Sequence, residues 1–580
     1  MEPKAFFLNP AIPTQRQYEA LRAFYAESLS ALDAAAKYGL SPSYFGKLRY
    51  EFACALKSGS NPFFQLKKTG PKKPFTDQAV IEVIVALRKQ NYSIVDIKAT
   101  LEAQGKSLSL EAIDNILKAE GFAPLPKRTR SERLSIKVPA KIEAPPSVSL
   151  ELADEEFSTE KGAAPLIFLP LLEKLNIIPA IKNAGFPSTS VLSDVSSVLS
   201  FMALKILGNE RLSHDATWNL DRGLGFFAGL NVLPKSSTLS TYSYMVQRSS
   251  NRKLLEGLSR IFQDTEAESG EFNLDFKTIP HWGEESILEK NWLGTRSKAI
   301  KSLLSLIVQA PGTGYLSYTD AEIRHRNQPQ AVLEFVDFWK TGRGVAPKML
   351  IFDSKFTTYE NLSRLNQSPE KIKFLTIRRR GKALLKQIPK IPEGEWQKIY
   401  LPKGINRKNR TLKVHDGTTR LRKYTGHVRQ VILTDHGREQ PAFLITNDFD
   451  MDIKDIVLKY ARRWLVEQEI AEQIAFFHLN QPSSSIVVKV DFDLTISLLV
   501  HNLYRYLTNN LPGFEHCNVP TIYRSFLENG ATIKVQGNEA VISIKKKTHL
   551  PILFQLPWLN EKTHLSWLGI NLSFHPATTS

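Results

Sequence analysis

The sequence predicts a multidomain α/β protein in which helical units precede a mixed core with a β-rich insertion. Three observations support this prediction. Helical periodicity with clear boundary residues occupies roughly the first 120 positions, and short apolar runs with acidic residues follow after position 270. A long amphipathic helix is then expected around the run YARRWLVE at 460–467. The 580 residues are enough for three or more folded units.

The first expected unit contains two helices, Ala31–Tyr38 and Pro42–Leu56, joined by a Gly-Leu-Ser turn. Glycine favours a helix C-cap, and serine followed by proline favours a helix start. Tyr44 and Lys47 would lie on the exposed face of the second helix, where a helix-turn-helix protein contacts the major groove of DNA. An ordinary helical bundle for oligomerisation is the alternative interpretation.

A second helical unit is expected after a basic linker, KKTGPKKP, whose charge suits a phosphate backbone. Asp77–Lys89 and Leu110–Glu120 read as helices. Between them Ser93 begins a helix, with Asp96 in the capping-box position where Glu or Gln is usual. The same two interpretations, DNA reader or oligomerisation bundle, apply here. Residues 123–162, which contain five prolines and several basic residues, are expected to form a flexible or extended linker and not a folded element.

Two acidic residues are expected at strands of the core. Asp275 lies in the alternating run EFNLDF, and Asp353 directly follows the apolar run Met349–Phe352, which is typical of a buried strand. A carboxylate at the mouth of a buried strand costs free energy unless it is hydrogen bonded or bound to a metal. For Asp353 the alternative role is to cap the next helix, expected at Thr357–Asn366.

Three polar residues share one face of the long helix. Tyr460, Arg463 and Glu467 are spaced i, i+3 and i+7, and apolar neighbours such as Ile456 and Val457 would pack the helix down. A solvated charged face is the alternative interpretation of this spacing.

Together these residues resemble the DDE transposases of bacterial insertion sequences, in the subgroup with the signature Y-x2-R-x3-E-x6-K. The resemblance covers roughly residues 160–510 and includes a GL-x-x-LP-x-x-STL segment at 229–239. By position, Asp275 matches the first acid, Asp353 the second and Glu467 the third. The final lysine of the signature falls at Ile474, so its DNA contact is missing or supplied from elsewhere.

The resemblance implies an RNase H-like catalytic core that cuts and joins DNA. Asp275, Asp353 and Glu467 would then be both catalytic residues and metal ligands. Phosphoryl transfer needs an activated nucleophile and neutralised charge, which two hard cations about 3.5–4 Å apart provide. Oxygen ligands without a His/Cys cluster favour two Mg²⁺ or Mn²⁺ ions over zinc. Arg463 could pair with a backbone phosphate, with Tyr460 beside it on the same face.

The charge distribution independently indicates a nucleic-acid partner. The chain carries a formal net charge of +18, and residues 371–430 hold 18 Lys and Arg against three acids, a net of +15. The DNA-binding candidates in this block are Arg407, Lys408, Arg410 and Lys413. A solvated basic loop is the alternative interpretation. The block is predicted to be β-rich, with strands at Trp396–Leu401, Thr411–Val414, Thr418–Arg422, Val428–Thr434 and Phe443–Thr446.

Several classes of protein find no support in the sequence. The two cysteines, Cys54 and Cys517, lack metal-ligand spacing and fit a reducing cytoplasm. We find no signal peptide, no apolar run long enough to cross a bilayer, no phosphate-binding glycine loop and no G-x-S-x-G motif. Near the C-terminus, Asp491–Leu507 is expected to be an apolar helix and Ala531–Lys547 a hairpin.

The expected function is therefore that of a bacterial DNA transposase, acting on element ends and target DNA as a homodimer assembled on DNA, in the cytoplasm at the nucleoid and without a membrane partner. The alternatives are a transposase-derived DNA-binding regulator without cleavage activity and a metal-dependent DNA nuclease. The expected organisation is two helix-turn-helix units at 1–62 and 75–122, a linker at 123–162, a helical segment at 163–270, core segments at 271–384 and 451–510 around the insertion at 385–450, and a C-terminal region at 511–580.

Overall fold

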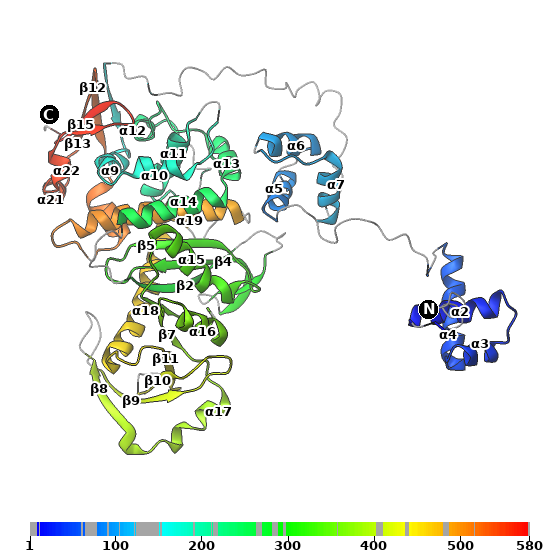
Figure 1. Ribbon diagram of the computed structural model, residues 1–580. Helices are drawn as coiled ribbons and strands as arrows, with labels where there is room; N and C mark the ends of the chain where they lie inside the picture. The colour runs from blue at the N-terminus through cyan, green and yellow to red at the C-terminus, as the bar shows by residue number, and fades with distance from the viewer. Residues whose placement is uncertain are drawn as a thin grey trace, which may run out of the picture. The chain divides into compact units, whose positions relative to one another are not determined.

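The computed structural model divides into two compact units, Met1–Asp77 and Gln78–Ser580 (Figure 1). It describes the chain except residues 1–8, 11, 60–61, 64–77, 90–91, 104, 121, 123–149, 151–153, 190–191, 210–211, 213–217, 263–269, 281–287, 294–296, 357, 402–409, 436–439, 479–486, 516 and 578–580. For residues 78–79, 89, 103, 410, 464–475 and 488 the backbone alone is described.

The first unit is helical and has its own apolar core. It consists of α2 (Pro13–Tyr25), α3 (Ala31–Lys37) and α4 (Pro42–Lys57). The predicted pair of helices is confirmed, and α2 is an addition that the sequence patterns did not indicate. Gly39 ends α3 at a φ of +64°, and the Ser41 side chain caps α4 by accepting a hydrogen bond from the backbone N–H of Tyr44.

The second unit begins with a small helical bundle, α5 (Gln78–Lys89), α6 (Ile94–Ala103) and α7 (Leu110–Ala119). The predicted capping box is present: the backbone N–H of Ser93 donates to Asp96, and that of Asp96 donates to the Ser93 hydroxyl. The linker prediction for 123–162 is wrong at its end, because Glu155–Thr159 forms strand β1. This strand pairs with β12, and Arg222 donates hydrogen bonds from Nη1 and Nη2 to the two carboxylate oxygens of Glu155.

A layer of helices follows, as predicted for 163–270. It comprises α9 (Ala163–Lys174), α10 (Ile177–Ala184), α11 (Asp194–Ile206), α12 (Arg222–Phe227), α13 (Ser236–Met245) and α14 (Arg248–Phe262). In the described residues no single helix is long and apolar enough to cross a membrane. Among the described helices, only α9 and α10 taken together would have the required length and apolar composition, and they are bent by 80° relative to each other. Their apolar side chains are buried in the core.

The main sheet runs in the order β3-β4-β2-β6-β7-β11-β10-β9-β8, with β5 paired to β4. Pairing is parallel from β2 to β6 and from β6 to β7, and antiparallel elsewhere. The strands are β2 (Glu271–Pro280), β3 (Lys290–Leu293), β4 (Lys298–Gln309), β5 (Leu316–Ile323), β6 (Met349–Phe352), β7 (Lys373–Ile377), β8 (Trp396–Leu401), β9 (Arg410–Thr419), β10 (Val428–Thr434) and β11 (Ala442–Thr446).

The two faces of the main sheet are covered by different helices. Leu350 and Phe352 of β6 join the large core with α14, α15 (Ala331–Arg343), α16 (Tyr359–Gln367) and α19 (Val487–Asn509). Met349 and Ile351 join a smaller core with Ile456 of α18 (Ile453–Phe476). The alternation of side chains along a strand thus assigns one face to the large core and the other to α18.

The insertion continues the main sheet, because β11 pairs with β7 and the remaining strands follow from it. Short helical turns precede β8, namely α17 (Lys382–Leu385), η4 (Ile388–Lys390) and η5 (Glu393–Glu395). One prediction is wrong: Thr418–Arg422 is not a separate strand, since β9 runs without a break through Asp416 and Gly417. Both residues stay in register with β10, and Asp416 is paired with Arg429 of that strand.

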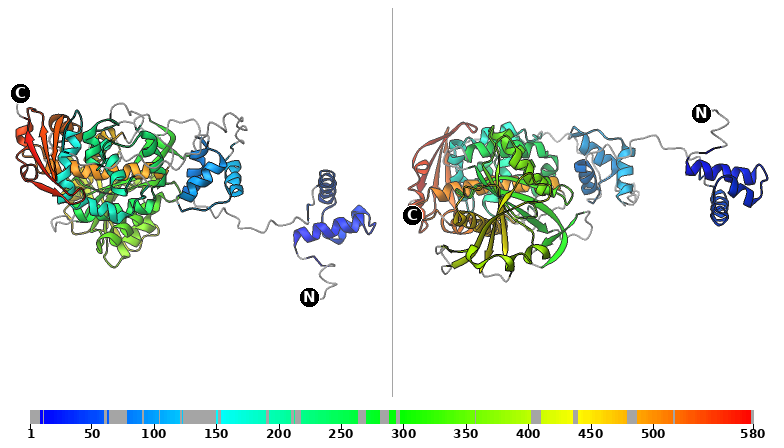
Figure 2. Two further views of the ribbon diagram at one scale, coloured as in Figure 1. Left: turned by 90° about the horizontal axis from the view of Figure 1, so that it is seen from above. Right: turned by 60° about the horizontal axis from the view of Figure 1, so that its bottom comes forward.

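The C-terminal region forms a second sheet in the order β1-β12-β13-β15-β14, beside α9 and α12 (Figure 2). The predicted hairpin is confirmed as β12 (Ala531–Gln536) and β13 (Glu539–Ile544). The other elements are a π-helical turn η6 (Tyr523–Leu527), α20 (Val519–Ile522), α21 (Leu550–Leu553), α22 (Pro557–Asn560), β14 (Thr563–Leu565), β15 (Ile570–Pro576) and, within the core, the turn η3 (Gln328–Gln330).

Candidate active site

Asp275, in the middle of β2, and Asp353, directly after the end of β6, lie next to each other on adjacent parallel strands. The register of β2 with β6 ends at the pair Leu274 and Phe352. Asp275 is the next residue of β2, and Asp353 is the first residue after β6. Residues that follow a registered parallel pair remain neighbours at roughly the strand spacing of about 5 Å. Both aspartates also continue the alternation that points Met349 and Ile351 towards α18, so they belong to the face that this helix covers.

Two aromatic rings on the opposite face hold these two segments together. Phe276 follows Asp275 directly, and Phe356 comes three residues after Asp353. Their rings are stacked with centroids 3.7 Å apart and an interplanar angle of 5°. Phe356 is 1% exposed and Phe276 is partly buried, so the stacked rings help to fix the distance between β2 and the end of β6.

Asp353 does not cap the helix that follows it. The N-cap of α16 is Thr358, whose hydroxyl accepts the backbone N–H of Asn361. The Asp353 carboxylate accepts the backbone N–H of Ser354 at 2.5 Å. Among the described residues no other donor forms a hydrogen bond with this carboxylate. The alternative role of Asp353, capping the next helix, therefore does not explain its position.

Helix α18 brings its polar face to β2. Arg463 is 4% exposed, and its Nη1 lies 3.6 Å from Oδ1 of Asp275. The guanidinium carbon of Arg463 lies 5.3 Å from the ring centre of Tyr460. The sequence suggested a phosphate as the partner of Arg463, whereas the partner seen here is Asp275. Position 467 lies one further turn along the same helix, and the side chain of Glu467 falls outside the described part.

The donor set of this site is made of carboxylate oxygens, which suit Mg²⁺ or Mn²⁺. Among the side chains that the structure describes, no group of three or more His, Cys, Asp or Glu residues is arranged to hold a metal. Asp275 and Asp353 would supply two carboxylates on one face, and Glu467 is the remaining member of the predicted set.

The candidate DNA-reading residues of the first unit are exposed as predicted. Tyr44 is 43% exposed, and its hydroxyl accepts a hydrogen bond from the Gln17 side chain at 2.7 Å. Lys47 is exposed and forms an i,i+4 ion pair with Glu51 at 3.7 Å, which is too weak to fix the lysine. The face of α4 that carries both residues is therefore open to a partner.

In the insertion, Lys413 of β9 has an internal partner. Its Nζ lies 2.6 Å from Glu393 and 5.3 Å from the ring centre of Trp396. Arg407 and Lys408 fall outside the described residues, and for Arg410 only its backbone position at the start of β9 is given.

All three acids of the block 371–430 are paired inside the insertion. Glu393 pairs with Lys413, Glu395 lies 3.0 Å from His415, and Asp416 holds Arg429 at 2.7 Å. The acids therefore neutralise residues on β9 and β10. Basic residues of the connection from β7 to β8 are exposed to solvent; these are Arg379, Arg380, Lys382, Lys386 and Lys390. Lys398 of β8 is exposed as well.

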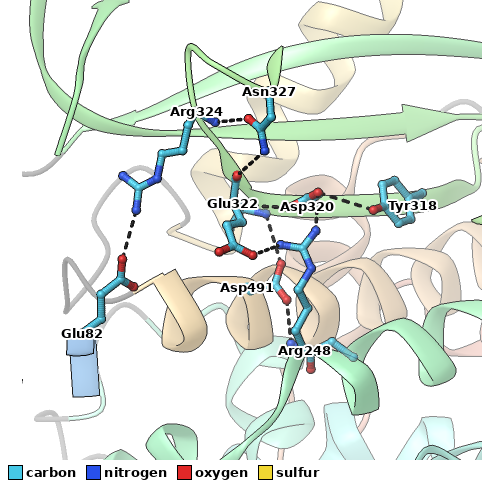
Figure 3. A network of polar contacts seen from close by, with 10 residues as sticks. Glu82, Arg248, Tyr318, Asp320, Glu322, Arg324, Asn327 and Asp491 are labelled. Atoms are coloured by element: carbon cyan, nitrogen blue, oxygen red, sulfur yellow. Dashed lines mark hydrogen bonds and ion pairs between the residues drawn. The ribbon is translucent and has the colours of Figure 1, made fainter. Parts of the chain in front are cut away.

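A second cluster of charged residues, which the sequence patterns did not reveal, lies on the opposite face of the main sheet (Figure 3). Arg248 at the start of α14 pairs with Asp320 and Glu322 of β5. Asp491 of α19 accepts the backbone N–H of Ala321 at 3.1 Å and the Asn251 amide at 2.9 Å. The network joins one strand to two helices, and no local sequence signal links residues so far apart.

Burial shifts the ionisation of this cluster. Desolvation raises the pKa of Asp491 to about 6, and the nearby Arg248 guanidinium limits the increase. Desolvation also raises the pKa of Tyr318, whose hydroxyl lies 3.5 Å from Asp320. The pKa of Arg248 is itself raised: its desolvation is outweighed by Asp320 and Asp491. The cluster is therefore a structural network of ion pairs whose pKa values are shifted by burial. Its carboxylates are engaged within the protein and are not a set of ligands for a metal.

A further ion pair extends from this region to the N-terminal bundle of the second unit. Arg324, just after β5, lies 3.1 Å from Glu82 of α5, and the backbone N–H of Arg324 donates to Asn327 (Figure 3). Glu82 is 8% exposed. Ala86 of the same helix packs on Tyr244, so α5 contacts the rest of the unit at two points.

No family model matches the chain, and no curated protein matches it. Solved structures that match include the piggyBac transposase synaptic complex with hairpin DNA, at 12% identity over 59% of this chain and 75% of that chain, with a TM-score of 0.34. Another is the Mos1 mariner paired-end complex with Mn, at 10% identity over 59% and 70%, with a TM-score of 0.10. TM-scores of this size do not establish a shared fold.

Proposed function

We propose that this chain is a DNA transposase that cuts and joins DNA by metal-dependent phosphoryl transfer, with Asp275, Asp353 and Glu467 as metal ligands. The observation that carries the proposal is the register of β2 with β6, which brings two acids side by side on the face covered by α18. The contact of Arg463 with Asp275 adds support, because it ties the helix that bears the third acid to the strand that bears the first.

We assign the main sheet to the RNase H-like class as part of this proposal. The support is its order. The strand with the first acid pairs antiparallel with β4, which pairs antiparallel with β5; on its other side it pairs parallel with β6, which pairs parallel with β7. The second acid follows β6, and the third lies on a later helix.

Mg²⁺ or Mn²⁺ bound by these acids would supply an activated nucleophile and neutralise charge on the transferring phosphoryl group. The chain's own residues have distinct tasks. Asp275 and Asp353 would offer oxygen ligands from two neighbouring segments that the stacked Phe276 and Phe356 hold together. Arg463 orients the Asp275 carboxylate and balances its charge in a desolvated position.

DNA recognition would be divided between two regions. Tyr44 and Lys47 on the exposed face of α4 are proposed to contact a terminal DNA sequence as a helix-turn-helix unit. The exposed basic residues of the insertion would attract phosphates without reading the sequence. Joining requires two DNA ends to be held together, so a homodimer assembled on DNA belongs to the same proposal.

The test is strand cleavage by the full-length protein on a duplex that carries the inverted repeats flanking its gene, with Mn²⁺. Alanine at Asp275, Asp353 or Glu467 should lower cleavage at least about a hundredfold, since each acid acts on the transition state, and leave binding nearly intact. Glu469→Ala and Glu472→Ala are controls on the same helix. Cleavage that persists in Asp353→Ala, or that is lost in Glu469→Ala and kept in Glu467→Ala, contradicts the assignment.

The same assay separates the alternatives. Binding to the repeats without cleavage by the parent would indicate a DNA-binding regulator. Cleavage without transfer of the 3′ end to a target plasmid would indicate a nuclease.

A further inference from the structure

A lysine outside the predicted signature links the helix with the third acid to the strand with the first. Lys459 precedes Tyr460, and its Nζ lies 2.7 Å and 2.5 Å from the two carboxylate oxygens of Glu271. Glu271 is the first residue of β2. The two side chains are 29% and 22% exposed, so the pair is largely shielded from solvent.

Lys459 and Arg463 hold the helix at two points of one strand. Lys459 contacts position 271, and Arg463 contacts position 275. On α18 these residues are separated by one turn, and position 467 follows after one more turn on the same side of the helix. The position of residue 467 relative to β2 is therefore set by the residues that anchor the two preceding turns.

The apolar contacts of α18 do not by themselves define this register. Ile456 and Val457 are buried against Met349 and Ile351 of β6, and such packing is not directional. A slide of one helical turn would displace position 467 by about 5.4 Å. A functional site needs its groups within about 0.5 Å. A short ion pair in which both carboxylate oxygens are bound supplies the missing directionality.

We propose that Lys459 is a positioning residue, whose pair with Glu271 sets the register of α18 on β2 and so the place of Glu467 relative to Asp275 and Asp353. This inference rests on the proposed metal site. Lys459 does not touch the metal or the DNA in this role; it acts through the helix. The partners that support metal ligands typically contribute 10–100-fold to metal affinity, and Lys459 and Glu271 are expected to act at the lower end of that range.

The experiment measures Mn²⁺ binding to the full-length protein by titration calorimetry, together with urea unfolding and nicking of supercoiled plasmid in Mn²⁺. Lys459→Met and Glu271→Gln should each weaken Mn²⁺ binding about tenfold. The double variant should be no weaker than either single variant, because both remove one interaction. Lys340→Met is the matched control, since Lys340 forms a 2.6 Å pair with Glu370 that does not involve α18, and it should keep the parent affinity.

The outcomes separate the inference from the proposed function. Parent affinity for Mn²⁺ in Lys459→Met, with only a lower urea midpoint, overturns the positioning role and leaves a structural ion pair. Additive losses in the double variant also overturn it. A parent that binds Mn²⁺ but does not nick DNA overturns the proposed function, while a tenfold loss of Mn²⁺ binding in the two variants still supports the positioning role. A parent that binds no Mn²⁺ overturns both.

Discussion

At the scale of single residues, ion pairs with one buried member occur on both faces of the main sheet. Arg463 meets Asp275 on the face of α18, and Arg248 meets Asp320 on the other face. Removing the partner of the buried member, Asp275 for Arg463 or Arg248 for Asp320, leaves a buried charge with less compensation, at a cost of up to about 3–5 kcal/mol. The two clusters still differ in a functional respect: the α18 side contains the proposed metal ligands, and the Arg248 side joins β5 to α14 and α19.

Asp491 is expected to make the stability of the protein depend on pH. Its pKa is raised by desolvation from an ordinary 3.8 to about 6, so the folded state binds the proton more tightly than the unfolded chain. The stability contributed by this group is therefore present below about pH 4 and is lost as pH rises through 6. In Asp491→Asn this loss disappears. The free energy of unfolding of the parent, relative to that of the variant, should fall by up to about 3 kcal/mol between pH 4 and pH 7.

Urea unfolding of both proteins across this pH range measures the difference. Asp337→Asn, on an exposed position of α15, serves as the control and should track the parent throughout. Unfolding free energies of parent and Asp491→Asn that run parallel from pH 4 to pH 7 would contradict the prediction.

At the scale of elements, sequence patterns predicted those strands and helix caps that depend on residues close together in the chain. The strand Met349–Phe352 and the strands of the insertion at Trp396–Leu401 and Val428–Thr434 have the predicted bounds. The capping box at Ser93 is present as well. In these cases an apolar run or a cap residue carries the information within a few positions of the chain.

Elements that depend on distant partners were not predictable in the same way. Asp416 and Gly417 look like a turn, yet pairing with β10 keeps them within β9. Glu155–Thr159 looks like linker, yet its pairing with β12 makes it a strand. For the candidate site, the sequence indicated the acids and the helix, while the partner of Arg463 and the pair of Lys459 with Glu271 required the tertiary arrangement.

The insertion should bind DNA through its exposed connection more than through Lys413. Changing Lys382, Lys386 and Lys390 together to Gln should reduce the slope of log affinity against log salt by about 2–3, since each phosphate contact contributes about 0.9. Lys413→Gln should leave this slope nearly unchanged, because Lys413 is engaged by Glu393 and Trp396. Salt titrations of binding to a random duplex provide the measurement.

A slope that falls in Lys413→Gln and stays at the parent value in the triple variant would locate the DNA contact on β9 instead. Unfolding of the triple variant in urea should match the parent, since its three side chains are exposed.

At the scale of the whole molecule, each compact unit has its own core. The first unit is built around Phe45 and Leu48 of α4 with α2 and α3, and the larger unit has the cores described above. A chain that begins at residue 78 should therefore keep the unfolding temperature of the larger unit within about 2 °C. It should lose sequence-specific binding to the inverted repeats and keep Mn²⁺-dependent nicking of plasmid DNA. Calorimetric unfolding and footprinting test the two parts, and an intact footprint without residues 1–77 would remove α4 from the proposed recognition role.

The pairing of β1 with β12 has a consequence for synthesis of the chain. Thr159 is registered with Ala531, so its partner is made about 370 residues later. At about 5–20 residues per second, the ribosome needs roughly 20–75 s to cover that distance. During this time the segment at 155–159 has no strand to join, although the helices and the main sheet between the two positions can already fold. A chain that stops before β12, by truncation or premature termination, would therefore expose an unpaired β1 edge. The small sheet can close only after β12 has been synthesised.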